Sequence, residues 1–403
     1  MNRLLYGPIG CGKTTDLLAR YEDLVNSGVP TGKILVLVLN APTVSDWRSR
    51  LSLAKSGSLN IFTYFGFVQR EITRCWREIE SSLIGGANSL EPTFMTTETA
   101  QYLMGLLVEE HRALQYFPEV RATAQQISIQ LIDNLNQASL NGLSLEEAGK
   151  RLLQAHNGDK DKIAAFGQSS ELMNAFRRKC IDSRCIDYSL TVDLFNSKLI
   201  ANPGYLAELN NTWEDLLVDN LEETVPAAQD LITVLLKGAK ESLLAFDPTG
   251  GHGVFFGADP QSAQAKIFPL CEVEVLNTSY IAPPALTEFA QGVADKILTG
   301  AEEDCFAGMG IMGQIFTQLR GDMIKETGKR ITELVEQGIP PEEIAVIAPT
   351  VDKVLEFSLG RALEQQGITL VNLTRGKRLL DQPFAQALVS LALLVYPEWR
   401  LEV

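Results

Sequence analysis

The residue types best suited to chemistry gather near the start of the chain, in a run of small residues followed by a lysine and two threonines. Such a loop can wrap so that successive backbone N–H groups point at one phosphate, and the helix after it adds its positive end. Lysine can reach the β- and γ-phosphates, and threonine can ligate Mg²⁺. The alternative is an ordinary glycine turn. The pattern Gly-x4-Gly-Lys-Thr therefore predicts an ATP-binding loop made of Gly7, Pro8, Ile9, Gly10, Cys11, Gly12, Lys13, Thr14 and Thr15.

A phosphate loop also needs an acidic partner at the end of a neighbouring strand. Asp219 ends the apolar run 216–218 and is, with Thr14, the predicted Mg²⁺ ligand; the alternative is a helix N-cap. The next residue is Asn220, and an amide cannot accept a proton as a carboxylate does. Glu222 and Glu223 are the candidate catalytic residues, because either could supply the base if the strand exit shifts by two residues.

These groups need elements that bring strand ends and a helix start together. Residues 3–6 are predicted as a buried strand before the loop, and residues 16–21 as an amphipathic helix after it. The continuous apolar run 33–39 is typical of a parallel sheet covered on both faces, and 43–53 can return as a helix. Strand and helix alternate, so the opening is predicted to be α/β.

From about residue 68 to 187 the apolar periodicity is that of long helices, which predicts a helical insertion. Strands are expected again near 213–219, 242–247 and 273–276. Beyond them a second α/β stretch is expected to hold the strands 344–348 and 369–371. The predicted organisation is a first α/β domain, the helical insertion and a partial second α/β domain, at residues 1–74 plus 186–275, 75–185 and 276–403.

Composition narrows the class of protein. Of the 403 residues 45% are hydrophobic, which suffices for two or three separate cores. A net charge of −15 argues against a protein that coats polyanions in general, though a local basic groove remains open. Six cysteines without a CxxC pair favour reduced thiols and a cytoplasmic location. No apolar stretch of about 18 residues occurs, so no membrane anchor is expected.

The order of these segments resembles the superfamily 1 DNA helicases of the UvrD/Rep/PcrA type, and the short start before the loop resembles AddB-like, recombinase-type proteins. The family pattern Val-Asp-Glu-Phe-Gln-Asp-Thr-Asn-Pro-x-Gln is similar to Val218-Asp219-Asn220-Leu221-Glu222-Glu223-Thr224-Val225-Pro226-Ala227-Ala228-Gln229. Further similar segments are Thr63-Tyr64-Phe65-Gly66-Phe67, Ile186-Asp187-Tyr188-Ser189-Leu190, Phe246-Asp247-Pro248-Thr249-Gly250-Gly251-His252-Gly253, Leu276-Asn277-Thr278-Ser279-Tyr280-Ile281-Ala282 and residues 338–347.

The resemblance implies a RecA-like P-loop NTPase fold with a helical insertion and a partial second RecA-like domain. It implies ATP and Mg²⁺ as cofactors, Tyr280 as a nucleotide contact, and single-stranded or partly duplex DNA as the substrate. The implied DNA contacts are Thr63, Tyr64, Phe65 and Phe255, whose aromatic rings can stack on bases; ordinary core packing is the alternative for each ring. The basic residues of the insertion, Arg177, Arg178, Lys179 and Arg184, are either phosphate contacts or a solvated helix end.

Departures from the family pattern leave the activity open. Asn220 stands where the family has its catalytic glutamate, Glu222 where it has a glutamine that senses the γ-phosphate, Gly250 where it has a coupling glutamine, and Ile281 where it has an arginine. The leading hypothesis is the motor of a DNA helicase or translocase in repair or recombination, with a partner subunit. A degenerate ATP-binding subunit that binds DNA or scaffolds a complex is the second, and a kinase-like phosphotransferase the third. We expect the isolated chain to hydrolyse little ATP, because no arginine-finger segment is present.

Overall fold

The computed structural model describes residues 1–53, 57–84, 91–155, 160–299, 313, 315–373 and 383–396. The chain divides into two compact units, Met1–Thr287 and Glu288–Val403. Each unit is described by itself.

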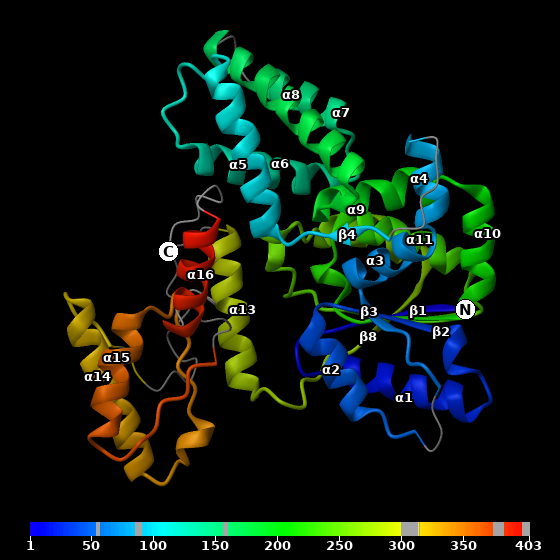
Figure 1. Cartoon of the computed structure of the whole chain (residues 1–403). Coiled ribbons are helices and arrows are strands. Elements are labelled where there is room, and N and C mark those ends of the chain that lie inside the picture. Colours follow the sequence, from blue (N-terminus) through cyan, green and yellow to red (C-terminus); the bar gives the residue numbers. More distant parts are fainter. Residues whose placement is uncertain are drawn as a thin grey trace. The chain divides into compact units, whose positions relative to one another are not determined.

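A parallel sheet of six strands forms the centre of the first unit, in the order β3-β2-β6-β7-β1-β8 (Figure 1). Every pairing in it is parallel. The carboxyl ends of the strands therefore meet at one edge, which is where ligands bind in such sheets. The strands are β1 (Asn2–Tyr6), β2 (Ile34–Val38), β3 (Ile61–Thr63), β6 (Asp215–Val218), β7 (Glu241–Phe246) and β8 (Glu272–Val275).

Alternate strand residues supply two separate apolar cores, as the two-residue period of a strand requires. In β2, Val36 packs with Tyr21 and Trp47 in the core beneath α1 (Lys13–Asn26) and α2 (Ala41–Arg50). Leu35 and Leu37 pack in the core on the opposite face. All five residues of β2 are buried, which explains the continuous apolar run. The α/β prediction is confirmed for this unit.

Helices from several parts of the chain cover the second face of the sheet, opposite α1 and α2 (Figure 1). A π-helix over Phe195–Ile200 joins two of them. They are α3 (Tyr64–Arg74), α9 (Tyr188–Leu194), α10 (Pro203–Thr212), α11 (Pro226–Gly238) and α12 (Pro260–Ile267).

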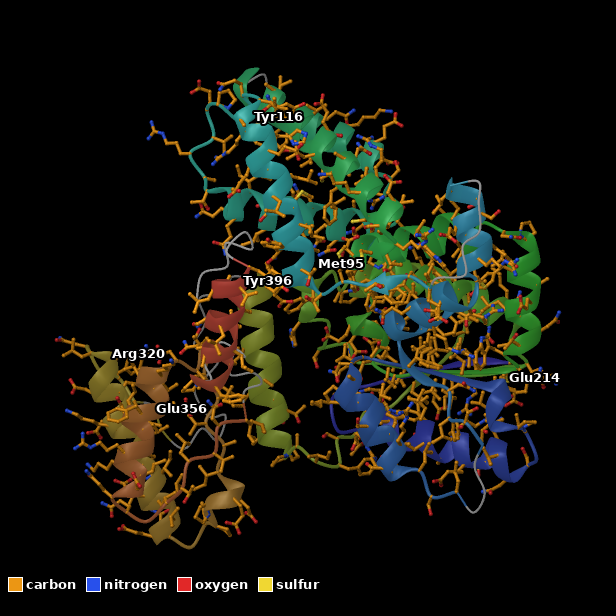
Figure 2. The ribbon with its side chains drawn as sticks, viewed as in Figure 1. Met95, Tyr116, Glu214, Arg320, Glu356 and Tyr396 are labelled. Carbon is orange, nitrogen blue, oxygen red and sulfur yellow. The ribbon has the colours of Figure 1, made fainter. Side chains whose placement is uncertain are left out.

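The predicted helical insertion between α3 and α9 is present. Its apolar residues, such as Met104 and Leu135, belong to the same core cluster as the sheet residues Leu35 and Leu37, so the described part of the insertion shares the core of the sheet. Figure 2 shows Tyr116 at the end of the insertion away from the sheet, where its hydroxyl donates a hydrogen bond to Glu171 Oε2 at 2.5 Å. The insertion contains α4 (Trp76–Ile84), α5 (Thr97–Ala113), α6 (Ala124–Leu140), α7 (Leu145–Ala155) and α8 (Lys160–Ser183), with the short paired strands β4 (Thr93–Phe94) and β5 (Cys185–Ile186).

The second unit is helical in its described part. A small core that includes Ile331 and Leu359 joins two of its helices. Arg320, labelled in Figure 2, donates two hydrogen bonds to the Asp352 carboxylate, at 2.7 and 2.9 Å. Strands at 344–348 and 369–371 were expected, and this expectation is wrong. Among the described residues both segments have no strand partner, and Ile347 is 95% exposed; a strand needs such a partner to be stable. The helices are α13 (Pro284–Thr299), which begins before the division, α14 (Arg320–Glu336), α15 (Lys353–Glu364) and α16 (Pro383–Val395).

Asp187 is a buried cap that should stabilise the first unit. It is 2% exposed, and its carboxylate accepts hydrogen bonds from Leu190 N at 3.0 Å and Ser189 Oγ at 2.8 Å. We expect Asp187→Ala to lower the free energy of unfolding by about 1–2 kcal/mol, because a buried N–H loses its acceptor. Asp187→Asn keeps an acceptor and should cost less. Urea unfolding of both variants measures this, and equal stability of Asp187→Ala and the unaltered chain would contradict it.

Candidate functional site

The glycine-rich loop lies between the end of β1 and the start of α1, at the carboxyl edge of the sheet. Gly10 and Gly12 have φ angles of 77° and 96°, in the left-handed region that favours glycine. Gly7 has no room for a side chain, since a Cβ there would lie 2.4 Å from Leu276 O. Helix α1 begins directly at Lys13, so its free N–H groups and positive dipole end face the loop.

The Lys13 ammonium is held above this loop. Its Nζ donates to the carbonyl oxygens of Gly7 at 2.5 Å and Pro8 at 2.7 Å. It also lies 3.5 Å from Asp247 Oδ2, just beyond the end of β7. The side chain is only 11% exposed, so the cation sits in a partly enclosed position at the loop's centre. This arrangement can oppose the charge of a phosphate group.

Asp219 meets the phosphate loop from the end of β6. Thr14 Oγ1 donates to its Oδ2 at 3.0 Å, and the Trp47 indole N–H donates to the same oxygen at 3.2 Å. The Asn220 backbone N–H donates to Oδ1 at 3.1 Å. Asp219 is 4% exposed, and burial raises the pKa of its carboxyl, while the donors Trp47 and Thr14 act in the opposite direction.

These oxygen groups fit Mg²⁺. The Thr14 hydroxyl and the Asp219 carboxylate are hard ligands that already lie in hydrogen-bond contact across 205 residues of sequence. In the part of the chain that the structure describes, no group of three or more His, Cys, Asp or Glu side chains could hold a metal. A metal held by one carboxylate and one hydroxyl needs further ligands from water and phosphate, which is the usual coordination of Mg²⁺ with a nucleotide.

The two candidate catalytic glutamates have different surroundings. Glu222 is 3% exposed and accepts hydrogen bonds from Asp247 N at 2.9 Å and Asn220 Nδ2 at 3.2 Å. Burial raises the pKa of Glu222, while the Asp247 backbone N–H and other hydrogen bonds act against the shift. Glu223 instead accepts three backbone N–H groups, from Gly251, His252 and Gly253, at 2.9–3.0 Å. This geometry favours an anchoring role for Glu223.

Tyr280, which the family resemblance implies as a nucleotide contact, lies at the phosphate loop. Its backbone N–H donates to Gly10 O at 2.9 Å, and the Ser279 hydroxyl donates to Ile9 O at 3.0 Å. The Tyr280 ring is 80% exposed and its Cε2 would lie 3.9 Å from a Cβ on Gly12. The ring is thus free to stack on a flat group beside the loop.

The carboxyl ends of β2, β3 and β6 frame a pocket of about 280 Å³. Three of the four predicted DNA contacts, Thr63, Tyr64 and Phe65, line it together with Asp219 and Asn220. Phe65 contacts the Tyr188 ring at 4.3 Å between centroids, a neighbour that the sequence did not indicate. The Tyr64 hydroxyl is buried, and its burial raises the pKa of that group.

Phe255, the fourth predicted contact, is not part of this pocket. Its ring is 83% exposed and stands edge-on to Phe256 at 5.5 Å, and Phe256 is the residue that lines the pocket. Thr63 also has a local task, because its Oγ1 accepts the Gly66 N–H at the start of α3. The structure therefore brings together an aromatic pocket and an exposed aromatic turn.

The basic cluster of the insertion is largely neutralised. Arg177 pairs with Asp193 at 2.7 Å, Lys179 with Glu110 at 3.5 Å, and Arg184 with the fully buried Glu80 at 2.5 Å. Arg178 is exposed. Three of the four cations already have carboxylate partners, which favours a structural role over phosphate contact.

A six-stranded parallel sheet with a glycine loop, a lysine and a threonine at its carboxyl edge defines a RecA-like P-loop domain. The family described as UvrD/REP helicase N-terminal domain matches the chain over residues 2–251, well over half its length, so the chain belongs to that family. Among curated proteins nothing matches it. No helix in the described residues is long and apolar enough to span a membrane.

Lys13 should account for much of the nucleotide affinity. We expect Lys13→Ala to weaken ATP binding by at least about tenfold, equivalent to about 1.4 kcal/mol, because the main side-chain charge opposing the phosphates is lost. Titration with a fluorescent ATP analogue measures this. Lys33→Ala is the control, since Lys33 pairs with Glu214 at the amino end of β2. Equal affinities of Lys13→Ala and Lys33→Ala would overturn the phosphate-loop assignment.

Proposed function

We propose that the chain is the ATP-binding motor portion of a UvrD-like helicase or translocase that acts on single-stranded or partly duplex DNA in repair or recombination. The observation that supports it most is the meeting of Lys13 and Thr14, at the start of α1, with Asp219, at the end of β6, at one edge of the sheet. We propose that it works inside the cell, with a partner subunit.

Each residue at the site has a distinct task in this proposal. The loop N–H groups and the start of α1 bind phosphate oxygens, and Lys13 supplies the opposing cation. Thr14 and Asp219 hold Mg²⁺, which when bound neutralises charge on the phosphates. Tyr280 stacks beside the loop. Lys13, Thr14 and Asp219 already lie at this edge, in contact with the loop or with one another.

The aromatic pocket supports DNA as the second ligand. Asp219 and Asn220 line it, and Asp219 also accepts a hydrogen bond from Thr14, so a base in the pocket would touch the strand end that carries the metal ligand. Sequence-tolerant binding of single strands relies on such aromatic platforms. A strand bound here could therefore influence the nucleotide site through one or two residues.

The order of Asn220 and Glu222 points to a catalytic role for Glu222. The family pattern has a carboxylate at the first of these positions and an amide at the second; in this chain the two are exchanged. The pair remains hydrogen-bonded, at 3.2 Å between Asn220 Nδ2 and Glu222 Oε1. A carboxylate whose pKa is raised by burial accepts a proton more readily than an exposed one near neutral pH.

The second candidate function is a degenerate subunit that binds ATP and DNA without hydrolysis. The observation in its favour is that both oxygens of Glu222 already accept hydrogen bonds. These bonds restrict the movement of the carboxylate toward an attacking water. Ile281, 83% exposed, also offers no charge to a nucleotide.

Hydrolysis distinguishes the two functions. In the protein as the cell produces it, we expect ATP turnover that is stimulated by single-stranded DNA. Glu222→Gln should lower kcat by about 10²–10⁴ with little change in ATP affinity, because a general base is lost. Steady-state phosphate release with and without DNA measures both effects.

The double variant Asn220→Glu plus Glu222→Gln is the control, since it restores the family's order of carboxylate and amide. It should recover activity that Glu222→Gln alone lacks, less a modest cost because Asn220 has a left-handed φ of 54°. ATP binding without turnover, with or without DNA, would instead support the degenerate subunit.

The exposed ring of Phe255 should contribute to single-strand binding. We expect Phe255→Ala to weaken binding of an oligothymidine by about 1–3 kcal/mol, the usual value of one stacked base, while the slope of log affinity against log salt stays unchanged because no charge is lost. Fluorescence anisotropy at several salt concentrations measures both. Phe357→Ala, at a 67% exposed phenylalanine of α15, is the matched control. Identical affinities of the two variants would remove Phe255 from the DNA-binding surface.

A further inference from the structure

Trp47 contacts the candidate metal carboxylate from an element outside the phosphate loop. Its indole N–H donates to Asp219 Oδ2 at 3.2 Å. The side chain is completely buried, and it packs with Tyr21 and Leu217 in the core beneath α1 and α2. Helix α2 thus reaches the end of β6 through a polar contact within an otherwise apolar core.

Of the other two donors to this carboxylate, one is itself a candidate metal ligand and the other is the backbone of the next residue. Thr14 contacts both carboxylate oxygens, at 3.2 and 3.0 Å, and is itself a candidate metal ligand. The Asn220 N–H belongs to the adjacent residue of the same strand end and contacts Oδ1 alone. Among the described residues, Trp47 and Thr14 are the side chains that donate a hydrogen bond to Asp219.

An indole N–H suits a position beside a divalent cation. It donates one hydrogen bond and carries no charge, whereas lysine or arginine at the same place would repel the metal that Asp219 is to bind. The ring is rigid and enclosed, so the direction of the N–H is set by packing. A buried carboxylate without this donor would also retain an unfavourable desolvated charge.

We propose that Trp47 is a positioning residue for Mg²⁺, holding the Asp219 carboxylate in the orientation in which it and the Thr14 hydroxyl face one metal ion. The inference rests on the proposed binding of Mg²⁺ with a nucleotide, and it adds Trp47 to the residues that support the metal. Hydrogen-bond partners of metal ligands commonly change metal affinity by about 10- to 100-fold when removed.

The test compares nucleotide affinity with and without Mg²⁺. A fluorescent ATP analogue is titrated into the full chain in excess Mg²⁺ and in EDTA, and the ratio of the two affinities isolates the contribution of the metal. Trp47→Phe keeps an aromatic ring and removes the donor. Trp76→Phe is the matched control, because Trp76 is also buried, at 4%, and its Nε1 has no hydrogen-bond partner in the structure.

Trp47→Phe should reduce this Mg²⁺-dependent gain by about tenfold or more and leave the affinity in EDTA within about twofold, whereas Trp76→Phe should change neither. A Trp47→Phe variant with the full Mg²⁺-dependent gain overturns the positioning role and leaves the proposed function intact. An unaltered chain whose affinity does not respond to Mg²⁺ overturns the proposed function, and the positioning role with it.

A second measurement does not depend on the stability of the variant. With ¹⁵N in the indole rings, each of the four tryptophans gives one N–H signal, and Phe substitutions at the other three identify Trp47 by elimination. Adding Mg²⁺ to the ATP-loaded unaltered chain should shift the Trp47 signal and leave that of Trp76 in place. A stationary Trp47 signal while Mg²⁺ tightens nucleotide binding would contradict the proposal.

Discussion

A buried carboxylate constrains the whole nucleotide site. Asp219 lies at 4% exposure, where an ionised group loses most of its hydration. Donors to it arrive from the start of α1, from α2 and from the chain just after β6, and the charge of Lys13 also favours its ionised form. Those three elements are neighbours because β2 pairs with β6, and β6 and β1 both pair with β7, with every strand parallel. The topology of the sheet is thus a precondition for a stable metal ligand.

The same edge explains why the loop needs its particular residues. Leu276 and Ser279, which follow β8, pack against Gly7 and Gly10 so closely that a Cβ would lie 2.4 Å and 2.7 Å from them. The loop is therefore enclosed on its outer side by the segment that carries Tyr280. Lys13 fills the inner side through its bonds to Gly7 O and Pro8 O. A phosphate can displace these carbonyl contacts at small cost, since the ammonium exchanges one set of oxygens for another.

Local sequence signals predicted the parts of this site that depend on short stretches of chain. The phosphate loop, the strand ending at Asp219 and the helical insertion each have a recognisable pattern, and the structure contains all three elements. Strand β3 was not predicted, because three residues are too few for a periodic signal. The segments near 344–348 and 369–371 have the composition of strands but no partner in the described residues. Composition alone cannot supply that partner.

Long-range contacts escaped the sequence analysis for a different reason. Trp47 and Asp219 are 172 residues apart, and a tryptophan on a helix predicts core packing before it predicts a hydrogen bond to a carboxylate. The partners of the basic cluster were likewise not visible in the sequence, because the carboxylates that neutralise Arg177 and Arg184 stand 16 and 104 residues away. A run of basic residues in the sequence suggests a basic surface, but in the folded chain these residues pair with carboxylates that are distant in the sequence.

The exchange of amide and carboxylate at Asn220 and Glu222 follows from backbone geometry as well as chemistry. Asn220 has φ 54° and ψ 50°, a left-handed conformation that asparagine tolerates better than glutamate does. Its side-chain amide donates to Glu222, whereas a glutamate at 220 would set two carboxylates against each other in a buried position. The sharp turn at 220 therefore favours the amide there and leaves position 222 for the acid. The site retains one carboxylate and one amide, with the carboxylate moved two residues along the chain, to where the backbone N–H of Asp247 can hold it.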